Sequence, residues 1–400
     1  MVSPAADSTT DTTDSSSESG ADTQPESGND TRTDSDSPLC TGTWSFAPSA
    51  GYFTGTKEGQ EPAGIAVGDF NHDGAIDIAS VHFDNSVGIL INAGDGAFRE
   101  PVTYAMSVLS PQAEAIAVGD FNGDGSLDVA VSCGGYPGNV GVMFNAGDGT
   151  FSAESVTYAI GGGSGMIAVG DFNGDGAPDL AVTNSIDGTV SVLLNAGDGT
   201  FAQQVTYSAG GAPGDAYSLA VADFNGDGAN DLAVVGGASA VIVLLNAGDG
   251  TFAKQVTYAP PAGRVLVADF NGDGRPDLGL AGVNGQAAAG VWLNAGHGAF
   301  DPQPTTAIDS NAWGFGVGDF NGDRRLDLAT SSFDHQTTSV LLGAGDGSFA
   351  PQLTYAVGLW NESLAVADFN GDGLADLAVS NSTGFPPELP SLYVFLSQCR

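Results

Sequence analysis

The residues best suited to chemistry in this chain are the acids and amides of a short loop that recurs seven times. In its commonest form the loop reads Asp-Phe-Asn-Gly-Asp-Gly-x-x-Asp. It places side-chain oxygens at positions 1, 3, 5 and 9, and alternate side chains of a tightly curled loop can converge on one point. A glycine at position 6 permits the sharp backbone turn that such convergence requires. This oxygen-rich pattern suits a hard cation.

Calcium is the predicted ion, with up to seven Ca²⁺ per chain. It takes about six to eight oxygen ligands, whereas magnesium demands stricter octahedral geometry and zinc or copper prefers His or Cys, which the repeats almost lack. Asp, Asn and Gly also favour turns, but clustered carboxylates repel one another unless a cation compensates them. The predicted ligands are Asp69, Asn71, Asp73, Asp77, Asp120, Asn122, Asp124, Asp128, Asp171, Asn173, Asp175, Asp179, Asp223, Asn225, Asp227, Asp231, Asp269, Asn271, Asp273, Asp277, Asp319, Asn321, Asp323, Asp327, Asp368, Asn370, Asp372 and Asp376.

Two details qualify this prediction. The start of the loop is similar to an EF-hand loop, but strand-like runs flank it and its last acid is at position 9, where an EF-hand has a Glu at position 12. We therefore do not assign an EF-hand. The sixth copy has Arg324 in place of the position-6 glycine, so its site is predicted to be the weakest.

The spacing of the loops predicts the elements that carry them. Subtracting neighbouring start positions gives 51, 51, 52, 46, 50 and 49 residues, which is the period of a four-stranded propeller blade. In the third copy, short β-favouring runs cover residues 166–169, 180–183, 189–194 and 201–207. No long window has a helical period, and the 60 glycines oppose helix. The sequence predicts an all-β, seven-bladed β-propeller of four-stranded blades.

A second repeated motif predicts how the ring closes. The turn Asn-Ala-Gly-Asp-Gly-x-Phe, or a close variant, joins the third and fourth strands of six blades, and the seventh copy is missing where the chain ends. Residues 45–52 instead match the fourth strand of a blade, so the N-terminal strand is predicted to close the last blade. Cys40 and Cys399 flank the missing turn, and we expect a disulfide between them. Cys133 is expected to be a structural residue.

Together, these loops and turns resemble the FG-GAP/VCBS repeat family, whose propeller repeats also occur in integrin α-subunits. The resemblance covers about residues 43–400. It implies calcium bound between the first two strands of each blade. It implies much less about function, because the family includes adhesion receptors, sugar-binding proteins and accessory domains of enzymes.

Composition limits the partners and the compartment. A net charge of −39 with only 9 Lys and Arg argues against nucleic acid, and no transmembrane segment is apparent. Residues 1–38 are predicted to be a disordered acidic Ser/Thr-rich tail, and residues 39–400 the propeller. Calcium loops and a disulfide favour a secreted, periplasmic or bacterial cell-surface protein. One form that we consider is a lipoprotein whose signal segment is absent from this chain. A monomer is favoured.

The ligand surface is expected on the face opposite the calcium loops. There the loops differ from blade to blade, which favours one composite site for an extracellular glycan or protein. The alternatives are that the aromatics plug the central channel, that the propeller is a carbohydrate-active lyase or hydrolase, or that it is purely structural. No catalytic motif is present, so an enzyme is not predicted. The candidate ligand-surface residues are Trp313, Trp360, Tyr136, Tyr217, His82, His335 and Phe385.

Overall fold

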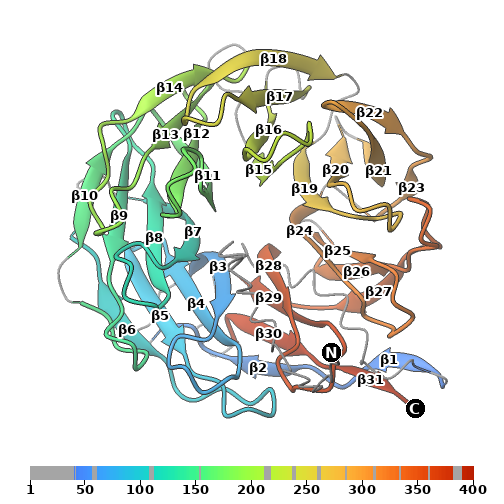
Figure 1. Ribbon diagram of the computed structural model, residues 1–400. Coiled ribbons are helices and arrows are strands. Elements are labelled where there is room, and N and C mark those ends of the chain that lie inside the picture. Colours follow the sequence, from blue (N-terminus) through green and yellow to red (C-terminus); the bar gives the residue numbers. More distant parts are fainter. Residues whose placement is uncertain are drawn as a thin grey trace, which may run out of the picture.

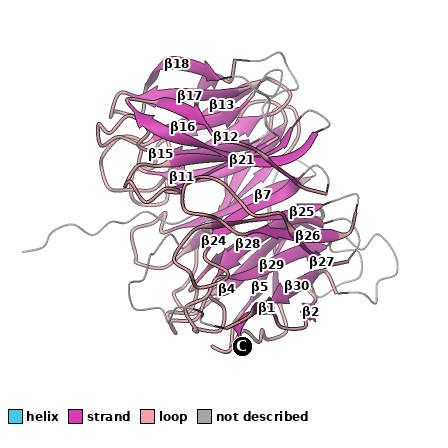
Figure 2. Cartoon of the chain, turned by 90° about the vertical axis from the view of Figure 1, so that its right-hand side faces the viewer, coloured by secondary structure: helices cyan, strands magenta, loops and turns pink. Residues whose placement is uncertain are grey.

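The computed structural model is a ring of seven blades arranged around a central axis (Figure 1). The described part of the chain is built of strands and contains no helix (Figure 2). The predicted all-β, seven-bladed propeller is confirmed. The structure describes residue 40 and residues 42–55, 61–107, 112–152, 155–210, 218–236, 240–258, 263–283, 286–309, 312–332, 335–358, 361–381 and 390–400. The tail predicted over residues 1–38 lies outside these ranges.

Each blade is an antiparallel sheet, and in the first six blades the strands follow chain order from the axis outward. The innermost strands are β3 (Pro62–Gly68), β7 (Ala113–Gly119), β11 (Ser164–Gly170), β15 (Ser218–Ala222), β19 (Arg264–Ala268), β24 (Ala312–Gly318) and β28 (Asn361–Ala367). The second strands are β4 (Asp77–His82), β8 (Asp128–Cys133), β12 (Asp179–Asn184), β16 (Asp231–Val235), β20 (Asp277–Val283), β25 (Asp327–Ser332) and β29 (Asp376–Asn381).

The third strands are β5 (Ser86–Leu90), β9 (Asn139–Met143), β13 (Thr189–Leu193), β17 (Val241–Asn246), β21 (Gln286–Gly296), β26 (Thr337–Leu341) and β30 (Leu392–Phe395). The outer strands are β6 (Val102–Ala105), β10 (Val156–Ala159), β14 (Val205–Ser208), β18 (Phe252–Tyr258), β22 (Ala299–Pro302) with β23 (Thr306–Ala307), β27 (Leu353–Ala356) and β2 (Ala50–Tyr52). The fifth blade has a divided outer strand because Pro302 and Pro304 have no N–H to donate to β21.

Buried hydrophobic residues of the described ranges form seven core clusters, each between two neighbouring blades. Aromatic triads reinforce most of these boundaries. Between the second and third blades, the ring of Phe201 lies 5.7 Å from that of Phe121 and 5.2 Å from that of Tyr158, with edge-to-face geometry. The Tyr158 hydroxyl also donates to the carbonyl of Gly199 (3.0 Å). The repeated aromatics therefore hold the ring together.

The seventh blade is built from both ends of the chain, as predicted. Strand β2 pairs with β30, and β1 (Trp44–Phe46) pairs with β31 (Ser397–Cys399) beside it (Figure 1). Phe46 takes the position of the missing hairpin Phe, with its ring 6.0 Å from that of Phe320. The Cys40–Cys399 disulfide is confirmed, with the two Cα atoms 5.5 Å apart, while Cys133 is buried and free.

Candidate metal loops and ligand surface

Each acidic loop is curled around the carboxylate at its first position. In the third blade, Asp171 accepts hydrogen bonds from the N–H groups of Gly174 (2.7 Å) and Gly176 (2.9 Å). The Asn173 amide oxygen accepts from the N–H of Asp175, and Asp175 Oδ1 accepts from that of Ala177, both at 2.9 Å. The same turn sequence that favours Asx hydrogen bonds thus gathers the oxygens of positions 1, 3 and 5 in one short loop.

Left-handed backbone conformations make this curl possible. The six glycines at position 6 have φ between 81° and 89°, a region that costs glycine little. Arg324, which replaces the glycine in the sixth copy, is held at φ 65°, and its N–H still bonds to Asp319 Oδ2 (2.6 Å). His72, at position 4 of the first copy, has φ 58° where the other copies have glycine. These two side chains introduce backbone strain.

The acid at position 9 has a structural task that sequence reasoning missed. Asp179 is fully buried, and its two oxygens accept hydrogen bonds from the N–H groups of Phe172 (2.8 Å) and Asn195 (2.7 Å). Asp179 therefore joins the acidic loop to the hairpin turn of the same blade through hydrogen bonds. Equivalent bonds occur in every blade, through Asp77, Asp128, Asp231, Asp277, Asp327 and Asp376.

Burial of these carboxyls is electrostatically costly. Desolvation raises the pKa of Asp179 to about 7, although its backbone hydrogen bonds lower it, and repulsion from Asp175 and Asp171 raises it further. The pKa of Asp327 and that of Asp376 are raised to about 8 for the same main reason. A cation placed among these acids would oppose the repulsion and favour the ionised form.

The loop residues fit a calcium ion by their donor chemistry. A carboxylate oxygen that accepts one N–H keeps a second lone pair, so the backbone bonds do not exhaust positions 1, 5 and 9. Asn225, at position 3 of the fourth loop, has a buried amide oxygen with no hydrogen-bond partner. No three His, Cys, Asp or Glu side chains in the described ranges form a metal-binding group. Each loop would therefore also need its Asn amide and a backbone carbonyl to bind calcium.

The hairpin Asn is a second residue whose role the repeat pattern did not reveal. Buried Asn195 donates from Nδ2 to the carbonyl of Phe121 in the preceding blade (2.9 Å) and to that of Pro178 in its own blade (3.0 Å). Four other blades repeat this inter-blade bond, but the sixth blade has Gly343 at this position and the seventh has Ser397. The retention of Asn in five of the six turns was the available sequence signal.

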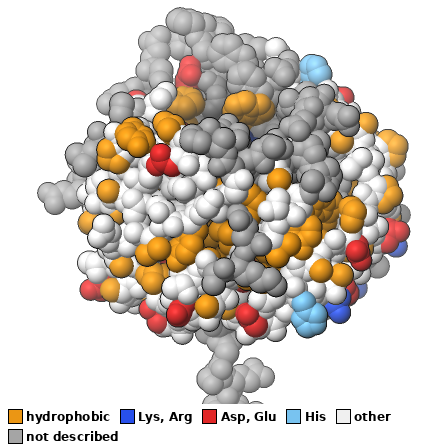
Figure 3. Space-filling model, turned by 90° about the horizontal axis from the view of Figure 1, so that it is seen from above, with side chains coloured by type: hydrophobic (Ala, Val, Ile, Leu, Met, Phe, Trp, Pro, Cys, Tyr) orange, Lys and Arg blue, Asp and Glu red, His pale blue; other side chains and the backbone are white. Residues whose placement is uncertain are grey.

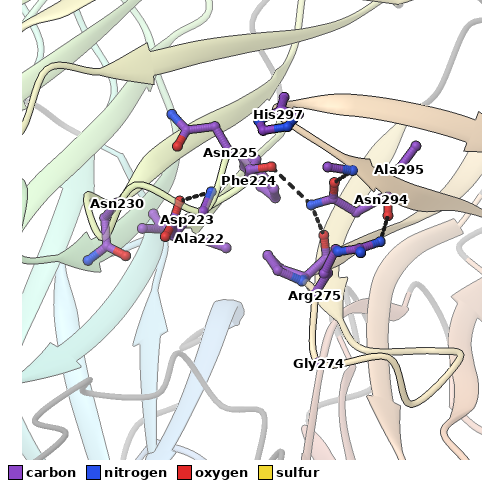
Figure 4. Close-up of a pocket in the computed structure, with 14 residues that line it drawn as sticks. Ala222, Asp223, Phe224, Asn225, Asn230, Gly274, Arg275, Asn294, Ala295 and His297 are labelled. Atoms are coloured by element: carbon purple, nitrogen blue, oxygen red, sulfur yellow. Dashed lines mark hydrogen bonds between the residues drawn. The ribbon is translucent and has the colours of Figure 1, made fainter.

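The acidic loops and hairpin turns lie on one face of the ring, as predicted. Loops of the fourth and fifth blades line a cavity of about 610 Å³ with the hairpin of the fifth blade (Figure 4). Its walls include Asn225, Asn230, Arg275 and His297, and Arg275 Nη1 lies 3.5 Å from Asp273 Oδ2.

Seen from the side, the rim of the ring has many acidic side chains along one edge, and hydrophobic side chains form a band across the visible surface (Figure 3).

The structure separates the candidate ligand residues into three groups. Tyr136 and Trp313 are 78% and 46% exposed, and His335 is also exposed. His82 is fully buried, so its assignment to the ligand surface was wrong. His82 is the last residue of β4, and its ring forms hydrogen bonds with Thr54 Oγ1 (3.0 Å) and Ser86 Oγ (3.0 Å). It is buried because the N-terminal segment, which carries Thr54, packs against this end of β4. The remaining candidates, Trp360, Tyr217 and Phe385, lie outside the described residues.

Solved structures with a similar fold share little sequence with this chain. A lectin from Agrocybe aegerita, studied for its recognition of non-reducing terminal N-acetylglucosamine, aligns with a TM-score of 0.53 and 22% identity over 86% of each chain. BBS1N in complex with ARL6DN aligns with a TM-score of 0.58 and 12% identity over 89% of this chain and 97% of that chain. A functionally unknown protein from Desulfotomaculum acetoxidans aligns with a TM-score of 0.51 and 14% identity, over 75% and 90%. These likenesses concern the fold alone.

Comparison with protein families gives a clear assignment. No curated protein matches the chain significantly. The model of the FG-GAP-like repeat matches six overlapping segments, at residues 69–131, 131–182, 171–234, 223–280, 269–330 and 319–379. Five of the six segments begin at the first Asp of an acidic loop, and together the six span most of the propeller. The chain belongs to the FG-GAP-like repeat family.

Proposed function

We propose that this protein is a calcium-stabilised extracellular propeller that binds a glycan or a protein through the loops opposite its acidic face. The observation that carries the proposal is the contrast between two sets of aromatic residues. Those of the repeat, such as Phe121 and Phe201, are buried between blades, whereas Tyr136, in the loop after β8, and Trp313, near the start of β24, are exposed and are not part of the repeat. Exposed aromatics on rigid loops are common anchors for ligands.

Calcium is proposed as a structural ion in this function. Its role is to neutralise three carboxylates per loop, in particular the buried one at position 9, whose pKa the fold raises. No chemical step on a ligand is assigned to it. Because the acidic loops lie on the other face of the ring, calcium would support the ligand loops only through the stability of the blades.

The disulfide and the calcium loops support an extracellular or periplasmic setting. Disulfides persist in oxidising compartments, and calcium sites on extracellular modules are filled at the high calcium concentrations found there. In the described part of the chain, no helix is long and apolar enough to span a membrane. The fold of the Agrocybe aegerita lectin, which recognises a terminal N-acetylglucosamine, makes a glycan the first ligand class to test.

A binding screen of the full chain against glycans and extracellular proteins, with calcium and with chelator, tests the proposal. We expect a ligand whose binding requires the folded, calcium-loaded ring and is weakened by Trp313→Ala or Tyr136→Ala. Phe201→Ala is the matched control: it should destabilise the fold by about 3 to 5 kcal/mol without selective loss of binding. If folded, calcium-loaded protein binds no member of either class, the proposed function is wrong.

A further inference from the structure

A rigid loop cluster between the second and third blades carries the most exposed large hydrophobic residue in the described ranges. Tyr136, which is 78% exposed, lies in the loop between β8 and β9. Two other loops, at residues 160–163 and 185–188, lie against this one. We call Tyr136, Gly162 and Asp187 together the Tyr136 platform.

Backbone hydrogen bonds hold the three loops together. Gly163 N–H donates to Gly135 O (2.7 Å), Gly138 N–H to Gly161 O (2.9 Å), and Ile186 N–H to Gly162 O (3.0 Å). The exposed ring is therefore carried on a backbone that is fixed by the fold and not on a free loop. A rigid anchor loses little conformational freedom when a ligand binds, which favours recognition at an exposed site.

The Tyr136 ring lies over the backbone of Gly162. A Cβ atom built at Gly162 would be 2.2 Å from Tyr136 Cδ2, so any side chain at this position would displace the ring. The carboxylate of Asp187 borders the same glycine, because its Oδ2 accepts the Gly162 N–H and its Oδ1 would lie 3.1 Å from that Cβ. An aromatic ring and a half-buried carboxylate thus flank one point on the surface.

From this arrangement we infer that the Tyr136 platform is a subsite for a neutral pyranose sugar, an inference that rests on the proposed function. The electron-rich face of an aromatic ring attracts the C–H face of a pyranose, and a carboxylate accepts hydrogen bonds from the hydroxyl groups at its edge. This combination of one apolar surface and a few fixed polar groups is typical of small-ligand sites.

The charges of the loop residues favour a neutral sugar over an acidic one. The three loops contain Asp187 but no Lys or Arg. A second acid, Glu114 on β7, borders the base of the first loop, since its Oε1 would lie 2.3 Å from a Cβ at Gly134. An anionic sugar would be repelled by both carboxylates, and no loop cation would offset the repulsion.

Binding of methyl glycosides to the calcium-loaded full chain tests this inference by calorimetry or saturation-transfer NMR. The probes are the methyl β-glycosides of glucose, galactose and N-acetylglucosamine, with methyl β-glucuronide as the charged comparison. We expect at least one neutral glycoside to bind more tightly than the glucuronide. Tyr136→Ala should weaken its binding by about tenfold, and Tyr136→Phe, which keeps the ring, by less than about threefold.

Further variants separate the ring from the carboxylate. Asp187→Asn keeps an oxygen that can accept the Gly162 N–H but removes the negative charge, so it should weaken the hydrogen bonds to the hydroxyl groups of the sugar. Gly162→Ala should displace the Tyr136 ring, although Gly162 has no side chain of its own to contact the sugar. Phe83→Ala is the matched control, because Phe83 is an exposed aromatic (36%) just after β4, on the first blade, and should leave binding unchanged. Melting curves should show the Tyr136 variants folded, since that side chain is exposed.

The possible failures are distinguishable. Unchanged affinity in Tyr136→Ala, or tighter binding of the glucuronide than of every neutral glycoside, would overturn the subsite. If no glycoside binds but the wider screen finds a protein partner, the sugar subsite is wrong and the binding function stands. If neither glycosides nor the wider screen gives a ligand for folded protein, both proposals fail.

Discussion

Asn145 Nδ2 lies 2.8 Å from the carbonyl oxygen of Phe70, across the boundary between the first and second blades. The same amide nitrogen donates to the carbonyl of Leu127 in its own blade (3.1 Å). Asn145 is only 3% exposed, so water cannot replace these bonds. A residue that marks a hairpin turn in the sequence thus joins two blades in the fold.

Replacing this Asn should destabilise the ring. Asn145→Ala leaves the buried carbonyl of Phe70 and the partly buried carbonyl of Leu127 with one hydrogen-bond donor fewer, and we expect a loss of about 1 to 3 kcal/mol in the free energy of unfolding. Asn145→Asp should cost more at neutral pH, because a carboxylate would face two carbonyl oxygens. Urea unfolding measures both. Equal stability of the Asp and Ala variants would contradict the assigned donor role of the amide.

Removal of calcium should lower the melting temperature sharply. Each ion that binds only the folded state contributes about 2.7 kcal/mol at a hundredfold excess over its Kd, although neighbouring sites are not additive. Calorimetry in calcium and in chelator checks this effect, and elemental analysis checks the number of ions. A melting curve that chelator does not move, or fewer than about five ions per chain, would count against the calcium assignment.

The sixth loop offers a test confined to one site. Arg324→Gly should stabilise the calcium-loaded protein by about 1 kcal/mol, because it relieves a left-handed non-glycine residue and removes a positive charge from the loop. Gly176→Arg in the third blade is the matched reverse change and should be destabilising. Calcium titrations of the two variants should shift in opposite directions; a shift in the same direction would show that position 6 does not control the site.

In chelator, stability should fall as pH rises from about 4 to 8. The position-9 aspartates have folded pKa values raised to about 6 for Asp77 and about 8 for Asp376, against about 3.9 in an unfolded chain. The folded state therefore binds more protons in this window, and rising pH removes that advantage. His82, whose pKa burial lowers, acts in the opposite direction. Aspartates whose pKa hydrogen bonds lower, such as Asp73, also act in the opposite direction, but their effect is confined to the lowest part of this window. Melting temperatures across this range check the trend, which calcium should weaken by competing with protons.

Loss of the disulfide should loosen the seventh blade selectively. In Cys399→Ser the pairing of β1 with β31 remains, but the chain-entropy model gives up to about 5 kcal/mol for the lost cross-link. We expect limited proteolysis to release the N-terminal segment before it cuts the other blades. Cys133→Ser, which removes the free thiol, is the control. If this variant were cleaved early and Cys399→Ser were not, the disulfide would not be what protects the seventh blade from proteolysis.

The sequence by itself determined the number of blades, their strand order and the closure of the ring. These follow from local periodicity: a loop and a turn that recur at a fixed spacing must occupy equivalent places, and the count of six turns for seven loops leaves one blade to be completed by residues 45–52. The disulfide followed from the same alignment, because Cys40 and Cys399 flank the missing turn.

Only the tertiary structure decided what each repeated polar residue does and which candidate residues reach the surface. Asp179 accepts a hydrogen bond from the N–H of Asn195 in the hairpin turn, and the Asn195 side chain donates to the carbonyl of Phe121 in the preceding blade. Such partners cannot be read from the pattern of one repeat. His82 is the last residue of a second strand and Tyr136 lies in the loop after another, yet His82 is enclosed by the N-terminal segment and Tyr136 is exposed. Burial depends on which distant segment packs over a residue, and a local pattern does not contain that information.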